Sequence, residues 1–387
     1  MTFPAFTVAR LPKIVFGEGR ITEVPKEVAA LGRQCLLVIG ARSLRGGPFW
    51  QALADGFARE GVAVDILAVD GEPSPERVDE AVARFQGAGI DVVAAVGGGS
   101  VLDAAKAIAG LLLPGNSVMD HLEGVGRGVP YRGSALPFVA VPTTAGTGSE
   151  ATKNAVLSRV GPDGFKKSFR HDDLVARVAV IDPALLSTCP RHVLAANGMD
   201  AFTQLLESYT STGANSFTDA LAWSGLEAFR DGFFAALDGD PEGRARLAYA
   251  ALLSGICLAQ TGLGAVHGLA SPLGAWFPIP HGVACGTLVA EATEVNLRAL
   301  AARRPDSPAA GKYARVGALL SGHESGAILV ETLRDWTGRL DIDRLGAYGV
   351  GEGDIARLVA ASGGNSMKTN PLVLEPGEIA EIVRRRL

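Results

Sequence analysis

Two histidines and an aspartate are the residues of this sequence best suited to chemistry. His267 and His281 are two of only six histidines, they lie close together in a segment rich in glycine and proline, and each is followed by Gly. Asp200 precedes Gln204 by four positions, which places both on one face of a helix. Two imidazoles and a carboxylate suit a first-row divalent ion such as Fe²⁺ or Zn²⁺. The segments are far apart in sequence, so an ordinary core or surface role for each histidine stays open.

A glycine-rich turn offers a second kind of site. It follows a predicted strand and precedes a predicted helix, and it consists of Gly97, Gly98, Gly99 and Ser100. Glycines in this position let the backbone approach a phosphate, which the free N–H groups of the helix can bind. They do not fit the pattern G-x-G-x-x-G, so the ordinary dinucleotide fingerprint is absent and a plain tight turn is an alternative. Asp103 is placed to face a ligand, whereas Lys106 is expected to form a surface ion pair.

A segment dense in hydroxyls and glycines, PTTAGTGSEAT at residues 142–152, follows another predicted strand. Its donors can surround a polar ligand while its glycines let the chain bend tightly. A solvated loop is the alternative for this segment alone. Together with the glycine turn, it favours a nucleotide at the carboxyl ends of a parallel sheet.

Alternating strands and helices must position these loops in the first half of the chain. Apolar strand signals lie at 35–40, 62–69, 91–100 and 137–144, and helical signals lie at 47–61, 74–89 and 101–113. Ser74 is the predicted cap of the second helix. Continuous apolar strands separated by helices predict a parallel sheet covered on both faces. From about residue 185 helical periodicity takes over, so we predict an α/β domain at 1–184 and an all-helical domain at 185–387.

Composition excludes several classes of protein. Of 387 residues, 48% are hydrophobic and 20% charged, as in a globular chain. The net charge of −5 comes from interspersed acids and bases, so nothing favours nucleic acid or an anionic membrane as a partner. The sequence shows neither a signal peptide nor a long apolar span. The four cysteines are far apart and are expected to be free buried thiols. We expect a cytoplasmic protein.

At this point the sequence resembles a family, the iron-containing (group III) alcohol dehydrogenases. The resemblance covers nearly the whole chain through ordered motifs. These are KIVFGEG, GEPSP, VGGGSVLDAAK, PTTAGTGSEAT, KKSF, AVIDPALLSTCP, GMDAF, VHGLASPLG, PHGVACGTLV and the terminal NPLVLEPGEIAEIVRRRL. It implies a dehydroquinate synthase-like fold of two domains, one α/β and NAD(P)-binding, the other helical and metal-binding. Hydride would pass between an alcohol and nicotinamide in the cleft between them.

The resemblance also assigns residues by position. Cofactor contacts would come from Glu72, Ser74, Gly97, Gly98, Gly99, Ser100, Asp103, Thr143, Thr144, Thr147, Ser149 and Lys167, with Lys166 a weaker candidate than Lys167. The metal, Fe²⁺ or Zn²⁺, would be bound by Asp200, Gln204, His267 and His281. Catalytic roles would fall to His267, His281 and Ser271.

Three departures from the family pattern leave alternatives open. The family usually has His at the position of Gln204, and often a proton-relaying His where this chain has Ser271. An amide is a weaker ligand than imidazole, so the metal is either retained by three good ligands or lost. Many NAD-preferring members carry an Asp where this chain has Ala41, and the Arg42 that follows could pair with a 2′-phosphate, which favours NADP slightly over NAD.

The leading hypothesis is therefore a metal-dependent NAD(P) oxidoreductase that acts on a small alcohol or carbonyl compound. The nearest alternative is a metal-independent reductase of an oxo acid, similar to maleylacetate reductases, in which hydrogen bonds polarise the carbonyl. A lyase similar to dehydroquinate synthase and a non-enzymatic scaffold are weaker alternatives. The apolar helices favour a homodimer.

Overall fold

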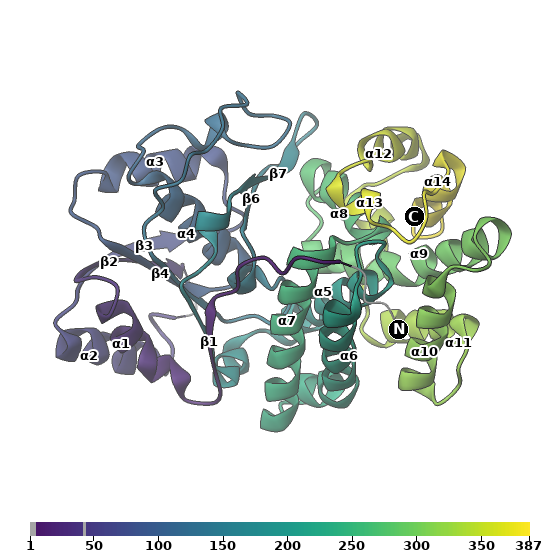
Figure 1. Cartoon of the computed structure of the whole chain (residues 1–387), viewed down its shortest axis with the longest axis horizontal. Coiled ribbons are helices and arrows are strands. Elements are labelled where there is room, and N and C mark those ends of the chain that lie inside the picture. The colour runs from purple at the N-terminus through teal and green to yellow at the C-terminus, as the bar shows by residue number, and fades with distance from the viewer. Residues whose placement is uncertain (1–4, 42–43) are drawn as a thin grey trace.

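The protein has two lobes, an α/β lobe and a helical lobe, which lie side by side along its longest axis (Figure 1). The computed structural model describes residues 5–41 and 44–387. The last strand of the main sheet ends at Ile181 and the first long helix begins at Arg191, on either side of the predicted boundary. The predicted fold class is confirmed.

The α/β lobe is built on a parallel sheet with the strand order β1-β8-β5-β4-β2-β3. Its strands are β1 (Lys13–Phe16), β2 (Gln34–Gly40), β3 (Ala63–Val69), β4 (Val92–Gly97), β5 (Phe138–Pro142) and β8 (Val178–Ile181). β4 and β5 are neighbours and are buried along their whole length. Because parallel strands end at one edge of a sheet, the loops that follow β4 and β5 come together there.

Helices cover both faces of this sheet. They are α1 (Val24–Ala29), α2 (Trp50–Glu60), α3 (Pro75–Phe85) and α4 (Gly99–Leu111). The core on one face includes α1 and α2, and the core on the other includes α3 and α4. As predicted, Ser74 caps α3, because its side chain accepts a hydrogen bond from the backbone N–H of Arg77.

The helical lobe is assembled around one buried helix, α5, which packs against α6, α7 and α9. Its helices are α5 (Arg191–Thr210), α6 (Ser216–Leu237), α7 (Pro241–Thr261), α8 (Ala265–Trp276), α9 (His281–Arg303), α10 (Pro308–Ser321), α11 (Gly326–Arg339), α12 (Ile355–Ala361), α13 (Asn365–Lys368) and α14 (Pro376–Arg384). Short 3₁₀ turns are η1 (Arg20–Glu23), η2 (Val118–Asp120), η3 (Ser149–Ala151), η4 (Asp172–Leu174), η5 (Pro183–Thr188), η6 (Leu345–Tyr348) and η7 (Glu352–Asp354).

A hairpin in the first half of the chain differs from the expectation of strands alternating with helices. An antiparallel hairpin, β6 (Asn154–Arg159) and β7 (Phe165–Arg170), packs against α8 of the helical lobe. Its strands are short and partly polar, so they lack the continuous apolar runs that marked β2 and β4. The Gly/Pro-rich segment around the two histidines forms α8 and α9, with a break that ends at Pro280, the residue that precedes the first turn of α9.

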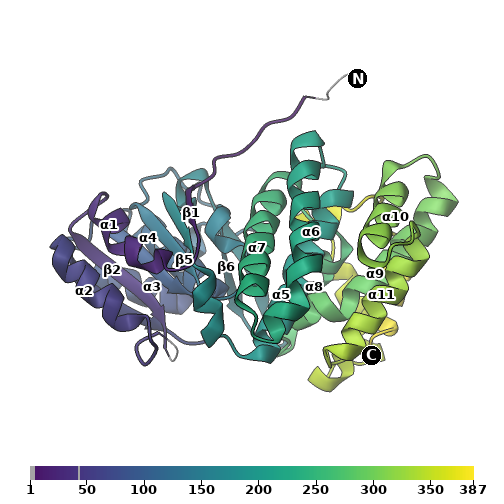
Figure 2. The same cartoon turned by 90° about the horizontal axis from the view of Figure 1, so that it is seen from below.

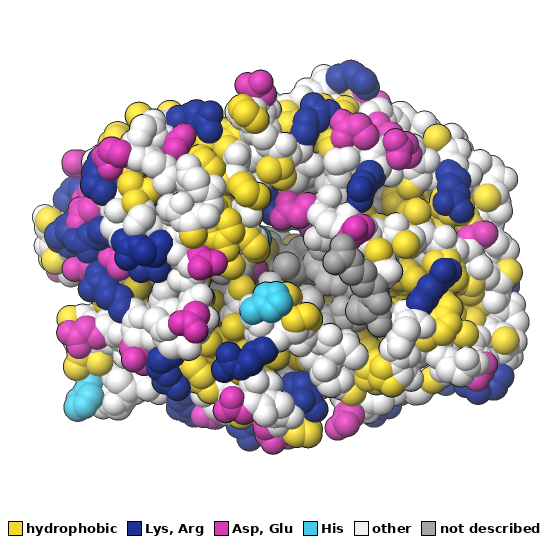
Figure 3. All heavy atoms as spheres, turned by 180° about the vertical axis from the view of Figure 1, so that it is seen from behind, with side chains coloured by type: hydrophobic (Ala, Val, Ile, Leu, Met, Phe, Trp, Pro, Cys, Tyr) yellow, Lys and Arg dark blue, Asp and Glu magenta, His cyan; other side chains and the backbone are white. Residues whose placement is uncertain are grey.

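The N-terminal residues run as an extended arm toward α7 and α6 (Figure 2). There the backbone N–H of Ala9 donates to Gln260 Oε1 at 2.7 Å, and Phe6 stacks on Phe217. On the opposite face of the molecule from Figure 1, acidic and basic side chains are interspersed around a central hollow (Figure 3). Within the described residues no single helix is long and apolar enough to cross a membrane, and α7 with α8 meets that length and composition only as a pair bent by 100°.

Candidate functional site

The glycine turn and the hydroxyl-rich loop meet at the edge of the sheet. The backbone N–H of Thr143 donates to the carbonyl oxygen of Gly97 at 3.0 Å. A Cβ atom at Gly99 would lie only 2.6 Å from the side chain of Thr147, so a side chain there would push the two loops apart. The predicted residues Thr144 and Ser149 belong to the same loop. The structure therefore brings together the two segments that the sequence singled out.

The glycine turn leads into the N-terminus of a long helix. Gly97 ends β4, Gly98 caps α4, and Gly99 and Ser100 form its first turn. The N-terminus of a 13-residue helix carries free N–H groups and a partial positive charge, both of which favour a phosphate.

Beneath this helix lies a buried ionic network, and it corrects the expectation for Lys106. Lys106 is fully buried, not paired at the surface, and its ammonium donates to Ser149, Thr152 and the carbonyl oxygen of Asn154. Asp103 lies 3.7 Å from Lys106 Nζ and accepts a hydrogen bond from Ser149 Oγ at 2.6 Å. Burial lowers the pKa of Lys106 to about 8, although Asp103 opposes this shift. Two predicted cofactor residues, Asp103 and Ser149, thus bond to each other.

A second pair of predicted cofactor segments meets beside the hairpin. Glu72 accepts hydrogen bonds from Lys166 Nζ and from Ser158 Oγ, both at 2.5 Å. Burial acts to raise the pKa of Glu72, but the positive charge of Lys166 and these hydrogen bonds outweigh it and lower the pKa. Alternation along β7 places Lys167 on the opposite face from Lys166. The geometry therefore favours Lys166, the weaker candidate, as the partner of Glu72, and the role of Lys167 stays a prediction.

Four side chains from three helices converge in the helical lobe: Asp200 of α5, His267 of α8, and His281 and Cys285 of α9. One ligand atom from each lies within 4.8 Å of the others. Asp200 Oδ1 is 3.1 Å from His267 Nε2 and 3.8 Å from His281 Nε2. Gly282 allows this approach, because a Cβ atom there would lie 2.5 Å from the carbonyl oxygen of Ala196 on α5.

The electrostatics of this cluster follow from burial and close opposite charges. Burial acts to raise the pKa of Asp200, but the two imidazoles outweigh it and lower the pKa to about 2. Burial acts to lower the pKa of His267, but its acidic neighbours raise the pKa well above the ordinary value. Burial lowers the pKa of His281 to about 4 and raises the pKa of Cys285 to about 12. Without a metal, the cluster therefore favours a carboxylate beside a protonated His267.

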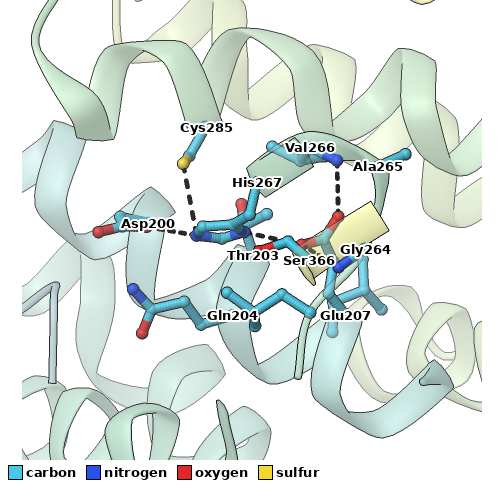
Figure 4. Close-up of polar contacts among 12 residues, drawn as sticks. Asp200, Thr203, Gln204, Glu207, Gly264, Ala265, Val266, His267, Cys285 and Ser366 are labelled. Carbon is cyan, nitrogen blue, oxygen red and sulfur yellow. Dashed lines mark hydrogen bonds and ion pairs between the residues drawn. The ribbon is translucent and has the colours of Figure 1, made fainter. Parts of the chain in front are cut away.

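A carboxylate behind the cluster fixes the orientation of His267 (Figure 4). Glu207 lies two turns after Asp200 on α5, and its Oε2 is 2.7 Å from His267 Nδ1. It also accepts hydrogen bonds from the backbone N–H groups of Gly264 and Val266 at the start of α8. Glu207 thus directs His267 Nε2 toward Asp200, an arrangement typical of metal-binding histidines.

Two predicted site residues are engaged by other groups. Gln204 Oε1 accepts a hydrogen bond from Ser254 Oγ at 2.7 Å, and both side chains are buried. Ser271 lies one turn after His267 on α8, and its hydroxyl donates to the carbonyl oxygen of Lys166 at 3.1 Å. The metal role of Gln204 and the catalytic role of Ser271 stay predictions.

Sequence reasoning missed Cys285 and Glu207. Cys285 was counted among the free buried thiols, and it is free and buried. It follows His281 by four positions on α9, the same spacing that drew attention to Asp200 and Gln204, so helical periodicity could have found it. Glu207 continues the face of α5 that carries Asp200 and Gln204. Arg42, on which the preference for NADP rested, lies outside the described residues.

Two large aromatic side chains of the helical lobe have structural contacts. Phe202 is fully buried and packs on Phe229 and Trp336 in the helical core. Trp276 Nε1 donates to the carbonyl oxygen of Gly164 at 3.2 Å, which links α8 to the hairpin turn. These contacts give both side chains a structural role.

Comparison with known proteins identifies relatives for both lobes. The chain is 36% identical over 283 residues to long-chain-alcohol dehydrogenase 1 of Geobacillus thermodenitrificans, covering 71% of this chain and 70% of that protein. It is 32% identical over 288 residues to lactaldehyde reductase of Escherichia coli, covering 73% of each. Its fold matches the crystal structure of 1,3-propanediol oxidoreductase with a TM-score of 0.89 and 27% identity, over 99% of this chain and 100% of the other.

A further structure is that of sulfoacetaldehyde reductase from Bifidobacterium kashiwanohense in complex with NAD⁺, with a TM-score of 0.85 and 25% identity over 99% of both chains. The family described as iron-containing alcohol dehydrogenase matches residues 12–183, and its C-terminal counterpart, the Fe-containing alcohol dehydrogenase family, matches residues 194–387. These relatives are oxidoreductases of alcohols and aldehydes, which does not favour the oxo-acid alternative. The chain is an enzyme and belongs to the iron-containing alcohol dehydrogenase family.

Proposed function

We propose that this protein is an NAD(P)-dependent oxidoreductase that interconverts a small alcohol and its aldehyde or ketone with the help of a divalent metal ion. The observation that carries the proposal is the convergence of Asp200, His267 and His281 in the helical lobe. The names of its relatives, alcohol dehydrogenases and lactaldehyde reductase, support the substrate class.

The donor set fits a divalent metal. Asp200 Oδ1 and the Nε2 atoms of His267 and His281 converge, and a carboxylate with two imidazoles suits Zn²⁺ or Fe²⁺. The other carboxylate oxygen, Asp200 Oδ2, is buried and has no hydrogen-bond partner among residues 5–41 and 44–387. Burying an unpartnered carboxylate oxygen costs free energy, and a bound cation would remove that cost.

The sheet edge fits a nucleotide. The N-terminus of α4 and the glycines before it form a cradle for a pyrophosphate, and a Cβ atom at Gly99 would disrupt it. The loop with Thr143, Thr144 and Thr147 lies beside it, and Glu72 with Lys166 adds polar groups near the cluster in the helical lobe.

In this scheme bound NAD(P) supplies or accepts the hydride, and the metal supplies a Lewis acid for the alcohol or carbonyl oxygen. The protein's own residues orient the metal ligands and stabilise the charge of the metal. Glu207 holds His267 by Nδ1, and Asp200 carries the negative charge that offsets a cation. A proton relay through Ser271 requires that its hydrogen bond to Lys166 opens.

The substitution Asp200→Asn tests the proposal. It keeps the shape of the side chain but removes the charge, so kcat/KM for small alcohols should fall on the order of 10²–10³-fold, as when a preorganised electrostatic group is lost. Metal content should fall with it. Asp172→Asn, at an exposed surface pair with Lys153, should leave both unchanged. Full activity in metal-stripped protein would overturn the metal role, and failure to bind NADH or NADPH in a fluorescence titration would overturn the cofactor role.

A further inference from the structure

The metal cluster has a fourth side chain that the family pattern does not supply. Cys285 Sγ lies 3.6 Å from His267 Nε2 and 3.8 Å from His281 Nε2. Resting on the proposed function, we propose that the Cys285 thiolate is the fourth metal ligand in place of Gln204, and that this soft donor favours Zn²⁺ over Fe²⁺ at the site.

Four of the six distances between the donor atoms are close to the edges of a tetrahedral site, and the other two are no longer than 4.8 Å. The edges from Asp200 Oδ1 to the two Nε2 atoms are 3.1 and 3.8 Å, and the edges from Cys285 Sγ are 3.6 and 3.8 Å. A tetrahedron with bonds of ~2.0–2.1 Å to nitrogen and oxygen and ~2.3 Å to sulfur has edges of roughly 3.3–3.6 Å. The four donors therefore need only small shifts to surround one ion.

Helical spacing explains why the thiol points into the cluster. His281 is the first residue of α9 and Cys285 follows it by one turn, so the two side chains share a face. α9 packs against α5 and α8, which carry Asp200 and His267. Cys285 belongs to the apolar core of the helical lobe, but its Sγ atom also contacts two imidazoles, which a thiol that only fills a core would not need.

Gln204 is the weaker candidate for the fourth position. Its Oε1 already accepts a hydrogen bond from Ser254 Oγ, and the amide carries no charge. In Figure 4, Gln204 and Cys285 lie on opposite sides of the His267 ring. A thiolate is a stronger ligand than an amide oxygen for Zn²⁺, and thiolates select soft or borderline metals.

Binding would be a ligand exchange at the metal ion, in which the sulfur replaces a water ligand that leaves to the solvent. The S–H bond of Cys285 breaks, its proton leaves to the buffer, and the sulfur lone pair forms the bond to the metal, with no change in oxidation state.

Cobalt spectroscopy tests this ligand directly. Metal-free protein titrated with Co²⁺ should develop a near-ultraviolet thiolate-to-cobalt charge-transfer band. The band should be absent in Cys285→Ala and Cys285→Ser and present in Gln204→Ala. Cys257→Ala is the matched control, because Cys257 is another buried thiol of the helical lobe, on α7 and in contact with the carbonyl oxygen of Thr218. It should keep the band.

Zn²⁺ competition gives a second measure. Loss of residues that hydrogen-bond to metal ligands typically lowers metal affinity by ~10–100-fold, and loss of Cys285 should weaken Zn²⁺ binding at least as much. Gln204→Ala should leave the Zn²⁺ affinity unchanged. The ratio of Zn²⁺ to Fe²⁺ affinity should also fall in Cys285→Ala. An unchanged ratio would overturn the proposal that Cys285 makes the site prefer Zn²⁺ over Fe²⁺.

The outcomes separate this inference from the proposed function. Co²⁺ binding to the wild-type protein without a thiolate band overturns the Cys285 ligand, even if neither variant folds, and leaves a metal-dependent activity standing. A band that survives in Cys285→Ala, or disappears in Gln204→Ala, overturns it as well. Failure to bind Co²⁺ or Zn²⁺ at all overturns both proposals.

Discussion

The two lobes each bury a cluster of charged groups, and the clusters differ in how completely they are satisfied. Under the hydroxyl-rich loop, Lys106 Nζ donates to Ser149, Thr152 and the carbonyl oxygen of Asn154, and Asp103 accepts from Ser149. In the helical lobe, by contrast, Asp200 Oδ2 and His281 Nδ1 are buried without hydrogen-bond partners in the part of the chain that the structure describes.

This difference separates a structural network from a binding site. The Lys106 cluster forms hydrogen bonds to the backbone of the hydroxyl-rich loop. It therefore fixes the shape of this loop, which we propose contacts the nucleotide. The Asp200 cluster leaves two buried polar atoms without hydrogen-bond partners among the described residues, which costs free energy in the absence of a ligand, and the carboxylate oxygen among them favours a cation. Breaking the first cluster should therefore reduce stability, whereas breaking the second should reduce metal affinity.

The largest expected effect on stability comes from Lys106→Met. The substitution keeps the length of the side chain but leaves the half-buried Asp103 without its cation and the groups around the buried Lys106 without their donor, so the free energy of unfolding should fall by about 3–5 kcal/mol. Denaturant titration measures it. Lys153→Met is the matched control, since it breaks the exposed pair with Asp172 and should cost only about 0–1 kcal/mol. Equal losses in the two variants would show that the Lys106 cluster is not a special support of the loop.

The sequence predicted the parts of these clusters that follow from local sequence patterns, and not the parts that depend on tertiary contacts. The glycine turn and the hydroxyl-rich loop each follow a buried apolar strand, so their meeting at one sheet edge followed from the parallel arrangement of β4 and β5. The burial of Lys106 did not follow, because a single lysine on a helix carries no signal of which tertiary contacts will cover it. The hairpin of β6 and β7 was missed for the same reason, since β6 is stabilised by contact with α4 and β7 by contact with α8.

In the helical lobe, the histidines and Asp200 were found from residue type and from the family resemblance, and they do converge. Cys285 was overlooked because free cysteines are common in cores, and only its position one turn after His281 distinguishes it. Glu207 acts through a neighbour on another helix, and one sequence gives no information on such pairs. The hydrogen bond that Gln204 Oε1 accepts could not be predicted either, because its donor, Ser254, lies on another helix, α7.

A smaller effect should appear in the pH dependence of stability through Glu150, which is buried beside the Lys106 cluster. Burial raises its pKa from 4.5 to about 7, although its own backbone N–H and Lys106 oppose the shift. Since the folded pKa is raised, the neutral side chain contributes stability that is fully present below about pH 4.5 and is lost as the pH rises through about 7.

Glu150→Gln should remove this loss. Relative to the wild-type protein, the variant should gain stability between about pH 4.5 and 7, up to on the order of 3 kcal/mol. Denaturant titrations across this range measure the gain. Glu242→Gln, at the exposed start of α7, should follow the wild-type profile. A Glu150→Gln profile parallel to the wild type would contradict the raised pKa.

The smallest effect is expected from Glu207→Gln, which is also the most direct test of the contrast between the Lys106 and Asp200 clusters. A glutamine has only one acceptor oxygen and no charge. It can therefore accept either from His267 and Gly264, which share Oε2 of Glu207, or from Val266, which uses Oε1, but not from all three. The orientation of His267 and its basicity should weaken together, so Zn²⁺ affinity should fall by ~10–100-fold. Lys106→Met, which breaks the closed cluster in the other lobe, should leave that affinity unchanged in the folded protein. If Glu207→Gln lowered only the unfolding temperature and left Zn²⁺ affinity intact, Glu207 would be a support for the start of α8 and no part of the metal site.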